Sequence, residues 1–192
     1  MKLIIGLGNP GILYKDSRHN IGFTVIRSLA KVYKIALKKE RGVLTIAGKG
    51  RINGNEVFLA MPLTYMNLSG SAVISLFEKY NKEFEDILVV CDDIDLEFGR
   101  LKIRPSGSSA GHRGVQSIID VLASEEFARL RIGIGRPNEK EETTKYVLSL
   151  FNRSEKQALK EVISRAVDCC KIWVTKGVTE SMNVFNKRSQ DE

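Results

Sequence analysis

The chain has 192 residues, 43% of them hydrophobic and 28% charged, which is ordinary for a soluble globular protein and enough to bury a core. No apolar run approaches the roughly 20 residues that a transmembrane helix needs, and the N-terminus lacks a signal-peptide pattern. We therefore expect one domain over residues 1–192, with no membrane association and a cytoplasmic location. The net charge of +7 favours polyanionic partners without identifying one.

The cysteine content points away from secreted and redox-active classes of protein. Cys91, Cys169 and Cys170 are too few for a disulfide framework, and the adjacent pair lacks the C-x-x-C spacing of zinc and redox sites. We expect all three to be small, largely buried residues in a reducing compartment.

The first third of the chain predicts a strand, a helix and a hairpin. An apolar run at residues 2–8 predicts a strand, and Asn-Pro-Gly at 9–11 predicts the turn that ends it. Apolar residues at helical spacing predict a helix near residues 20–33. Two further strands flank Asn-Gly-Asn at 53–55, which favours a β-hairpin because Asn and Gly tolerate positive φ.

The rest of the chain alternates strands with helices. Asn67 is expected to cap a helix that continues to about Tyr80. The remaining elements are strands at 87–91, 101–104 and 130–134, and helices at 112–123 and 154–175, the last closed by Gly177. This pattern predicts an α/β fold, a single-domain mixed β-sheet flanked by helices on both faces. Functional loops are then expected at strand ends.

Two glycine motifs match known site patterns but lack the context that those sites require. Residues 6–11 fit the G-x-G-x-x-G dinucleotide fingerprint, but Pro10 interrupts the run and the helical period starts well after it. Residues 107–111 fit the G-x-S-x-G nucleophile elbow, which needs a carboxylate and a histidine later in the chain. No histidine follows His112. We therefore predict a flexible Gly/Ser loop at 106–111.

A sparse set of polar residues is predicted at the ends of these elements: Asn9, His19, Asn67, Asp92 and His112. Ester hydrolysis requires a base for water, a group that orients the base, and donors for the oxyanion. Imidazole titrates near neutrality, a carboxylate can fix its tautomer, and carboxamides can donate to a carbonyl without titrating. The same residues also suit a turn, a helix cap, a solvated loop or a metal-binding cluster, and spacing alone does not bring them together.

Several sequence blocks occur together and in a characteristic order. They are GLGNPG at 6–11, Tyr14, RHNIG at 18–22, PLTYMNLSG at 62–70, DDIDL at 92–96, GHRG at 111–114 and RLRIGIG at 129–135. In these blocks and their order the chain resembles the bacterial-type peptidyl-tRNA hydrolase family, from residue 2 to about residue 186. Blocks in register are far more specific than any single motif.

The resemblance implies an enzyme that hydrolyses the ester between a peptide and the 3′-terminal ribose of its tRNA, which recycles tRNA from stalled translation. It implies a monomer that works without a metal or cofactor and has tRNA as its partner. His19 would be the general base that activates water, and Asp92 would hold His19 in its basic form. Asn9 would distinguish blocked from free aminoacyl ends.

The other substrate-binding roles that the resemblance implies fall on Tyr14, Tyr65, Met66, Asn67 and His112. Tyr14, Tyr65 and Asn67 would contact the tRNA end and the peptide. Met66 would shape the site, and His112 would lie at its rim.

Arg113 stands where many members of the family have Asn. Its guanidinium cannot reproduce the paired donor and acceptor of a carboxamide, so we expect it to contact an acceptor-stem phosphate instead. Lys102, Arg104 and Arg131 lie on strands that lead towards the predicted site and are further candidates for phosphate contacts.

Two other classes of protein fit part of the pattern. A non-enzymatic RNA-binding relative, similar to plant organelle intron-splicing factors, would keep the fold without the reaction, but the presence of both His19 and Asp92 favours the enzyme. A general small-ester hydrolase would have no use for the basic surface, and salt would hardly affect its turnover.

Overall fold

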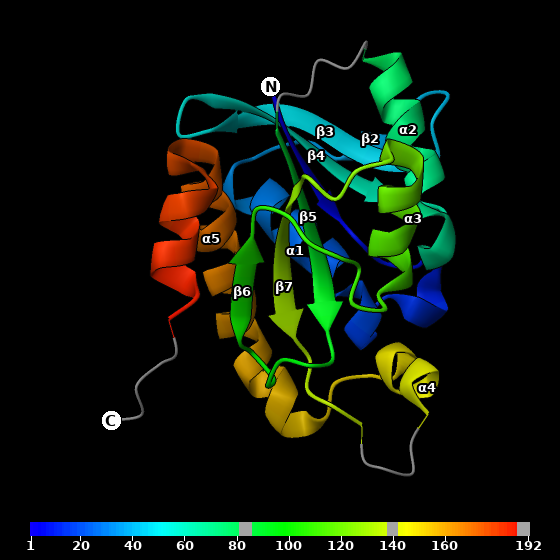
Figure 1. Ribbon diagram of the computed structural model, residues 1–192, viewed down its shortest axis with the longest axis vertical. Helices are drawn as coiled ribbons and strands as arrows, with labels where there is room; N and C mark the ends of the chain where they lie inside the picture. The colour runs from blue at the N-terminus through cyan, green and yellow to red at the C-terminus, as the bar shows by residue number, and fades with distance from the viewer. Residues whose placement is uncertain (81–85, 138–141, 188–192) are drawn as a thin grey trace.

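The computed structural model describes residues 1–80, 86–137 and 142–187, and one seven-stranded sheet runs through its centre (Figure 1). In spatial order its strands are β2 Lys38–Lys39, β3 Thr45–Ile52, β4 Asn55–Pro62, β1 Lys2–Gly6, β5 Asp86–Asp93, β7 Ala128–Gly133 and β6 Leu101–Arg104. β1 pairs in parallel with β4 and β5, β5 pairs in parallel with β7, and the strands at both edges are antiparallel. The predicted mixed sheet is confirmed. The carboxyl ends of β1, β4, β5 and β7 meet at one edge.

Helices cover both faces of the sheet because its central strands are apolar on both sides. The helices are α1 Ile21–Val32, α2 Ser69–Lys79, α3 Arg113–Leu122, α4 Thr143–Leu148 and α5 Arg153–Phe185, with short 3-10 turns η1 Ile12–Tyr14, η2 Arg18–Asn20 and η3 Met66–Leu68. Ile4 and Val90 face the core shared with α1 and α5. Ile5 and Val89 face the core shared with α2 and α3 (Figure 1). In the described part of the chain, no helix is long and apolar enough to cross a bilayer.

The predicted hairpin forms between β3 and β4. Asn53 and Gly54 connect the two strands with φ values of 47° and 85°, the left-handed conformation that a two-residue hairpin turn requires. The register runs without a break from the pair Ile52–Asn55 to the pair Thr45–Pro62.

Two local expectations differ from the structure, and one helix was not expected. Asn67 does not cap α2, because it lies within η3 and the helix begins two residues later with Leu68 in the capping position. Gly177 interrupts α5 without ending it, since its φ of 85° breaks the helical path and the chain then resumes helical geometry up to Phe185. Met182 and Phe185 pack against the core, and this packing stabilises the helical segment that follows Gly177. α4 was not expected from the sequence.

Candidate active site

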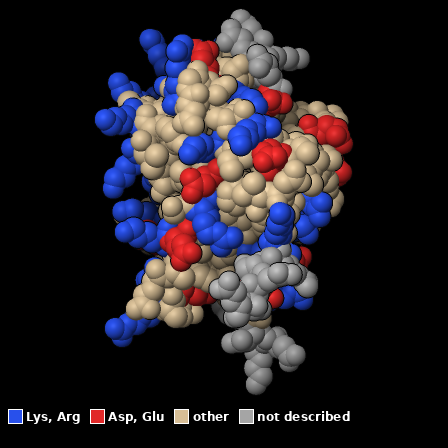
Figure 2. Space-filling view, turned by 90° about the vertical axis from the view of Figure 1, so that its left-hand side faces the viewer, with Lys and Arg blue, Asp and Glu red and all other residues tan. Residues whose placement is uncertain are grey.

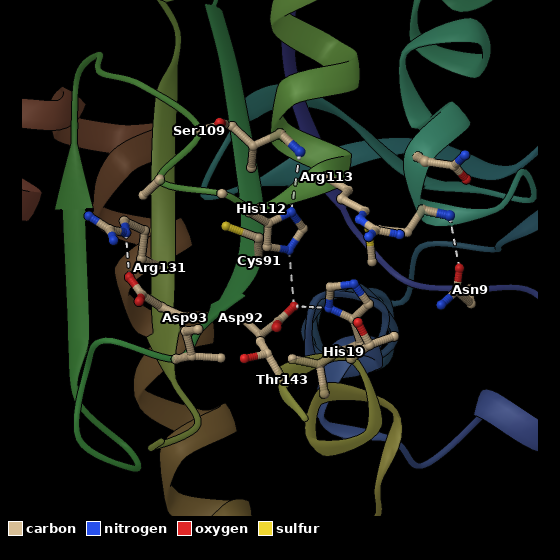
Figure 3. Close-up of a pocket in the computed structure, with 18 of the residues that line it drawn as sticks. Asn9, His19, Cys91, Asp92, Asp93, Ser109, His112, Arg113, Arg131 and Thr143 are labelled. Atoms are coloured by element: carbon tan, nitrogen blue, oxygen red, sulfur yellow. Dashed lines mark hydrogen bonds and ion pairs between the residues drawn. The ribbon is translucent and has the colours of Figure 1, made fainter. Parts of the chain in front are cut away.

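A cavity of about 480 Å³ opens at the sheet edge where the parallel strands end (Figure 3). Its walls come from the turn after β1, η2, η3, the last residues of β5, the 108–111 loop with the start of α3, and α4. The topology therefore gathers segments that are far apart in sequence, as parallel α/β sheets do at their carboxyl ends.

Both histidines of the chain contact the same carboxylate oxygen. Asp92 Oδ1 lies 2.7 Å from His19 Nδ1 and 3.1 Å from His112 Nε2 (Figure 3). Asp92 is the last residue but one of the buried strand β5 and is only 4% exposed. His19 comes from η2, and His112 immediately precedes α3.

The environment keeps Asp92 ionised. Burial by itself raises the pKa of the Asp92 carboxyl, but the hydrogen bonds from His19 and His112, and their charges at the acidic pH where both rings are protonated, outweigh burial and hold that pKa well below its usual range. As a carboxylate, Asp92 is an acceptor only, so the bond to His19 places a proton on Nδ1, and in the neutral ring Nε2 is then the nitrogen with the free lone pair. The pair therefore supplies a base together with the group that fixes its tautomer.

Asn20 joins η2 to the turn after β1. Its Oδ1 accepts from the Asn9 backbone N–H at 2.8 Å, and its Nδ2 donates to the Asn9 carbonyl at 2.9 Å. The Asn9 side-chain oxygen accepts in turn from the Met66 N–H at 2.8 Å (Figure 3). These bonds fix the Asn9 carboxamide with its NH₂ group as the end that can donate into the cavity.

Arg18, the first residue of η2, anchors this turn to Ser149 and Glu155. Sequence reasoning did not predict this role. The Arg18 guanidinium donates to both carboxylate oxygens of Glu155, at 2.7 and 2.8 Å, and its Nε donates to Ser149 Oγ at 3.2 Å. It also lies over the Tyr146 ring, 4.4 Å from the centroid. Glu155 forms a capping box with Asn152 at the start of α5. The Asn-x-x-Glu pattern could have located the start of α5, but it does not point to Arg18 as the partner of Glu155.

The structure brings together all the predicted site residues except Tyr14. Those that line the cavity are Asn9, His19, Tyr65, Met66, Asn67, Asp92, His112 and Arg113. Tyr14 is half-buried on η1, outside the residues that line the cavity. Its contact with substrate stays a prediction. Thr143, Thr144, Val147 and Leu148 of α4 complete the wall and were not anticipated.

The Gly/Ser loop forms one wall of the cavity, and Arg129 anchors its first residues. The Arg129 guanidinium donates to the carbonyl of Gly107, to that of Ser108 at 2.9 Å and to that of Glu125 at 2.9 Å. Arg129 is 3% exposed and packs on the Phe127 ring, 4.3 Å from the centroid. The start of this loop is therefore tied to β7.

The three cations proposed for phosphate contacts have different surroundings. Arg131 lines the cavity, but its Nε forms an ion pair with Asp93 (Figure 3). Lys102 lies opposite Arg131 in the β6–β7 register, and Arg104 lies opposite Arg129. Burial, and then the neighbouring charges of Arg104, Arg131 and Arg100, lower the pKa of Lys102.

His19, Asp92 and His112 bring a nitrogen, an oxygen and a nitrogen within 4.8 Å of one another, as a metal site would. His112 Nδ1, however, accepts from the N–H groups of Gly114 and Val115 at 3.1 and 3.2 Å. A neutral imidazole that ligates a metal through Nε2 carries its hydrogen on Nδ1. In His112 that hydrogen would point at the two backbone N–H donors, which need an acceptor there. The residues therefore fit a hydrogen-bonded network better than a metal centre.

Comparison with known protein families gives a match over nearly the whole chain. The sequence model of the family described as Peptidyl-tRNA hydrolase matches residues 3–192. The chain belongs to the peptidyl-tRNA hydrolase family. A peptidyl-tRNA hydrolase from Geobacillus thermodenitrificans is 47% identical over 189 residues, which cover 97% of this chain and 100% of the relative. One from Aquifex aeolicus is 50% identical over 169 residues, 88% of each chain.

Solved structures of peptidyl-tRNA hydrolases share the fold over nearly the whole chain. The crystal structure of the Acinetobacter baumannii enzyme has a TM-score of 0.90 at 37% identity and covers 97% of this chain and 94% of that one. The crystal structure of a peptidyl-tRNA hydrolase in complex with N-propanol has a TM-score of 0.91 at 36% identity. The match covers 100% of this chain and 97% of that one. The predicted family, hydrolase class and fold are confirmed.

Proposed function

We propose that the chain hydrolyses the ester between the peptide and the 3′-terminal ribose of peptidyl-tRNA, with His19 as general base and Asp92 as the residue that orients it. The observation that carries the proposal is the 2.7 Å bond from His19 Nδ1 to the buried Asp92 carboxylate, at the wall of a cavity that both residues line. An ester is more labile than an amide, so one base with donors for the oxyanion is sufficient chemistry.

The proposed reaction begins at His19 Nε2. This nitrogen takes a proton from water while the water oxygen attacks the ester carbonyl. Asn67, on the cavity wall, is our candidate donor to the developing oxyanion. Collapse of the tetrahedral intermediate breaks the bond between the carbonyl carbon and the ribose oxygen. That oxygen takes the proton back from His19, and the products are a free peptide and tRNA.

Asn9 accounts for a preference for blocked substrates. Its side-chain oxygen is occupied by the Met66 N–H, so the carboxamide presents a donor to the cavity. An N-acylated aminoacyl end offers a carbonyl to that donor. A free aminoacyl end carries an ammonium group, which is itself a donor only and finds no acceptor there.

Release of tRNA from N-acetylaminoacyl-tRNA and from free aminoacyl-tRNA, measured side by side, tests the proposal. We expect rapid release from the blocked substrate alone. Binding of tRNA without release would favour the non-enzymatic RNA-binding relative. Equal, salt-independent cleavage of simple esters would favour a small-ester hydrolase. We also propose that the protein acts as a monomer, which light scattering of the purified chain measures.

A further inference from the structure

His112 makes two sets of contacts from opposite ends of one ring. At one end, Nδ1 accepts from the backbone N–H groups of Gly114 and Val115, which makes His112 the N-cap of α3. At the other end, Nε2 lies 3.1 Å from Asp92 Oδ1. Histidine is not a preferred N-cap, for which Ser, Thr, Asp and Asn are favoured. Capping alone therefore does not account for this residue, whereas a ring that spans from the helix amides to Asp92 does.

The two sets of contacts define the protonation of the ring. An N–H donor needs a lone pair, so Nδ1 carries no hydrogen, and a carboxylate acceptor needs a donor, so Nε2 carries one. His112 is thus a neutral imidazole with its proton on Nε2. His19 is its counterpart, because the bond to Asp92 places a proton on Nδ1 and the neutral ring then carries its lone pair on Nε2. The histidines bind one carboxylate oxygen as opposite tautomers, with ring centroids 5.0 Å apart.

The packing around His112 leaves the ring little freedom. A Cβ atom added at Gly114 would lie 3.2 Å from His112 Cε1 and 2.4 Å from Met66 Sδ. Any larger residue at this position would force the ring or the Met66 side chain to shift, so glycine lets both approach α3 closely. Because the ring is held at both nitrogens and closely packed against Gly114, it acts as a fixed donor to Asp92.

We propose that His112 is a positioning residue: held as the Nε2–H tautomer by the first amides of α3, it gives Asp92 Oδ1 a second donor and keeps the carboxylate aimed at His19 Nδ1. The inference rests on the proposed function, in which His19 is the base. It also explains why the two histidines do not exchange roles. The lone pair of His112 is used by the helix, so only His19 can accept a proton from water without loss of a helix cap.

Two substitutions separate capping from positioning. In His112→Asn, the carboxamide oxygen still accepts from the amides of α3, but the shorter side chain cannot reach Asp92. We expect the thermal unfolding midpoint of wild type and a kcat lower by about 10- to 100-fold, the scale of a misplaced catalytic group, with KM little changed. His112→Ala should show the same fall in rate and also unfold at a lower temperature. Gln116→Ala, on the exposed side of α3, is the control and should keep kcat.

A ¹⁵N NMR spectrum of the histidine rings at neutral pH reads the tautomers directly and needs no substrate. We expect a protonated Nε2 and an unprotonated Nδ1 on His112, and a proton on Nδ1 in the neutral form of His19. A proton on His112 Nδ1, or full kcat in a folded His112→Asn variant, would overturn the proposal. Failure of the wild-type protein to release tRNA would instead overturn the proposed function. The NMR result tells the two failures apart, because it does not depend on activity.

Discussion

Arg113 is exposed at the cavity wall, at the first position of α3 and next to the inward-facing His112. From there its charge can meet a phosphate oxygen without entering the protein interior. We expect Arg113→Asn to keep turnover within about tenfold, a cost of about 1.4 kcal/mol or less. The variant should also lower the salt sensitivity of KM, because it neutralises one phosphate fewer. Steady-state kinetics on full-length peptidyl-tRNA at several salt concentrations measures both effects.

A short substrate without the tRNA body provides the control for Arg113. It should be hydrolysed by Arg113→Asn as fast as by wild type. If the variant is instead slower on the short substrate while binding is unchanged, Arg113 acts in the chemical step and the phosphate assignment is wrong.

Sequence reasoning predicted most of the residues that meet in the cavity but not the arginines that hold its walls in place. His19 and Asp92 could be proposed because their side chains suit ester hydrolysis, and the ordered motif blocks added the expectation that they meet. Arg18 and Arg129 were not proposed, because the role of a buried arginine is decided by partners far away in the sequence. Arg18 meets Glu155 across 137 residues, and no local pattern encodes that distance.

The short turn η2 carries His19 and is anchored by the ion pair between Arg18 and Glu155. Burial raises the pKa of Glu155, but hydrogen bonds from Arg18 and the Asn152 backbone, together with the Arg18 charge, lower it overall. The folded pKa then lies below the unfolded value of about 4.3. The pair therefore contributes its full stability above that unfolded value and loses it as the pH falls through the folded value.

We expect Glu155→Gln to lower the free energy of unfolding at pH 7 by roughly 1–3 kcal/mol, the worth of hydrogen bonds to a charged group. The difference from wild type should shrink as the pH falls below about 4. Urea unfolding at a series of pH values measures it. Glu142→Gln is the matched control, since Glu142 pairs with Lys145 on the surface and both side chains are more than two-thirds exposed. A pH-independent effect of Glu155→Gln would show that packing, not charge, stabilises this contact.

Among the helices, strands and turns, those with a strong local sequence pattern were predicted correctly, and those placed by tertiary packing were not. The hairpin turn at 53–54 and the strand Leu101–Arg104 appear where the sequence places them. α4 has six residues, too few for a helical period to stand out, and it is placed by its contacts with η2. Gly177 has the sequence signature of a helix end, yet tertiary packing lets α5 resume beyond it.

The charge of the whole molecule, +7, is not spread evenly over the surface. Figure 2 shows Lys and Arg side chains crowded along the left edge of the α5 side, with acidic side chains mostly towards the centre and right. A second basic group lies on β6 and β7, where Lys102 is opposite Arg131 and Arg131 is paired in register with Cys91, the residue before Asp92. Because Arg131 is already paired with Asp93, we expect its β6 neighbour Lys102 to be the strand cation that meets substrate phosphate.

We expect Lys102→Gln to raise KM for full-length peptidyl-tRNA. It should also reduce the slope of log KM against log salt by about 0.9 for each phosphate that the protein no longer neutralises. Hydrolysis of a minimal substrate should be unchanged, because the chemical step does not involve this side chain. Lys49→Gln removes the same charge from the exposed β3 face and is the control. Equal effects of the two substitutions would mean that only net charge matters.

The most direct test of the central claim compares wild type with His19→Ala in single-turnover hydrolysis of N-acetylaminoacyl-tRNA. Loss of a general base should lower the rate by on the order of 10²–10⁴-fold. Because His19 lies on a short turn held by Arg18 and Asn20, the variant should still fold and bind tRNA. A folded His19→Ala protein that releases tRNA at close to the wild-type rate would contradict the account.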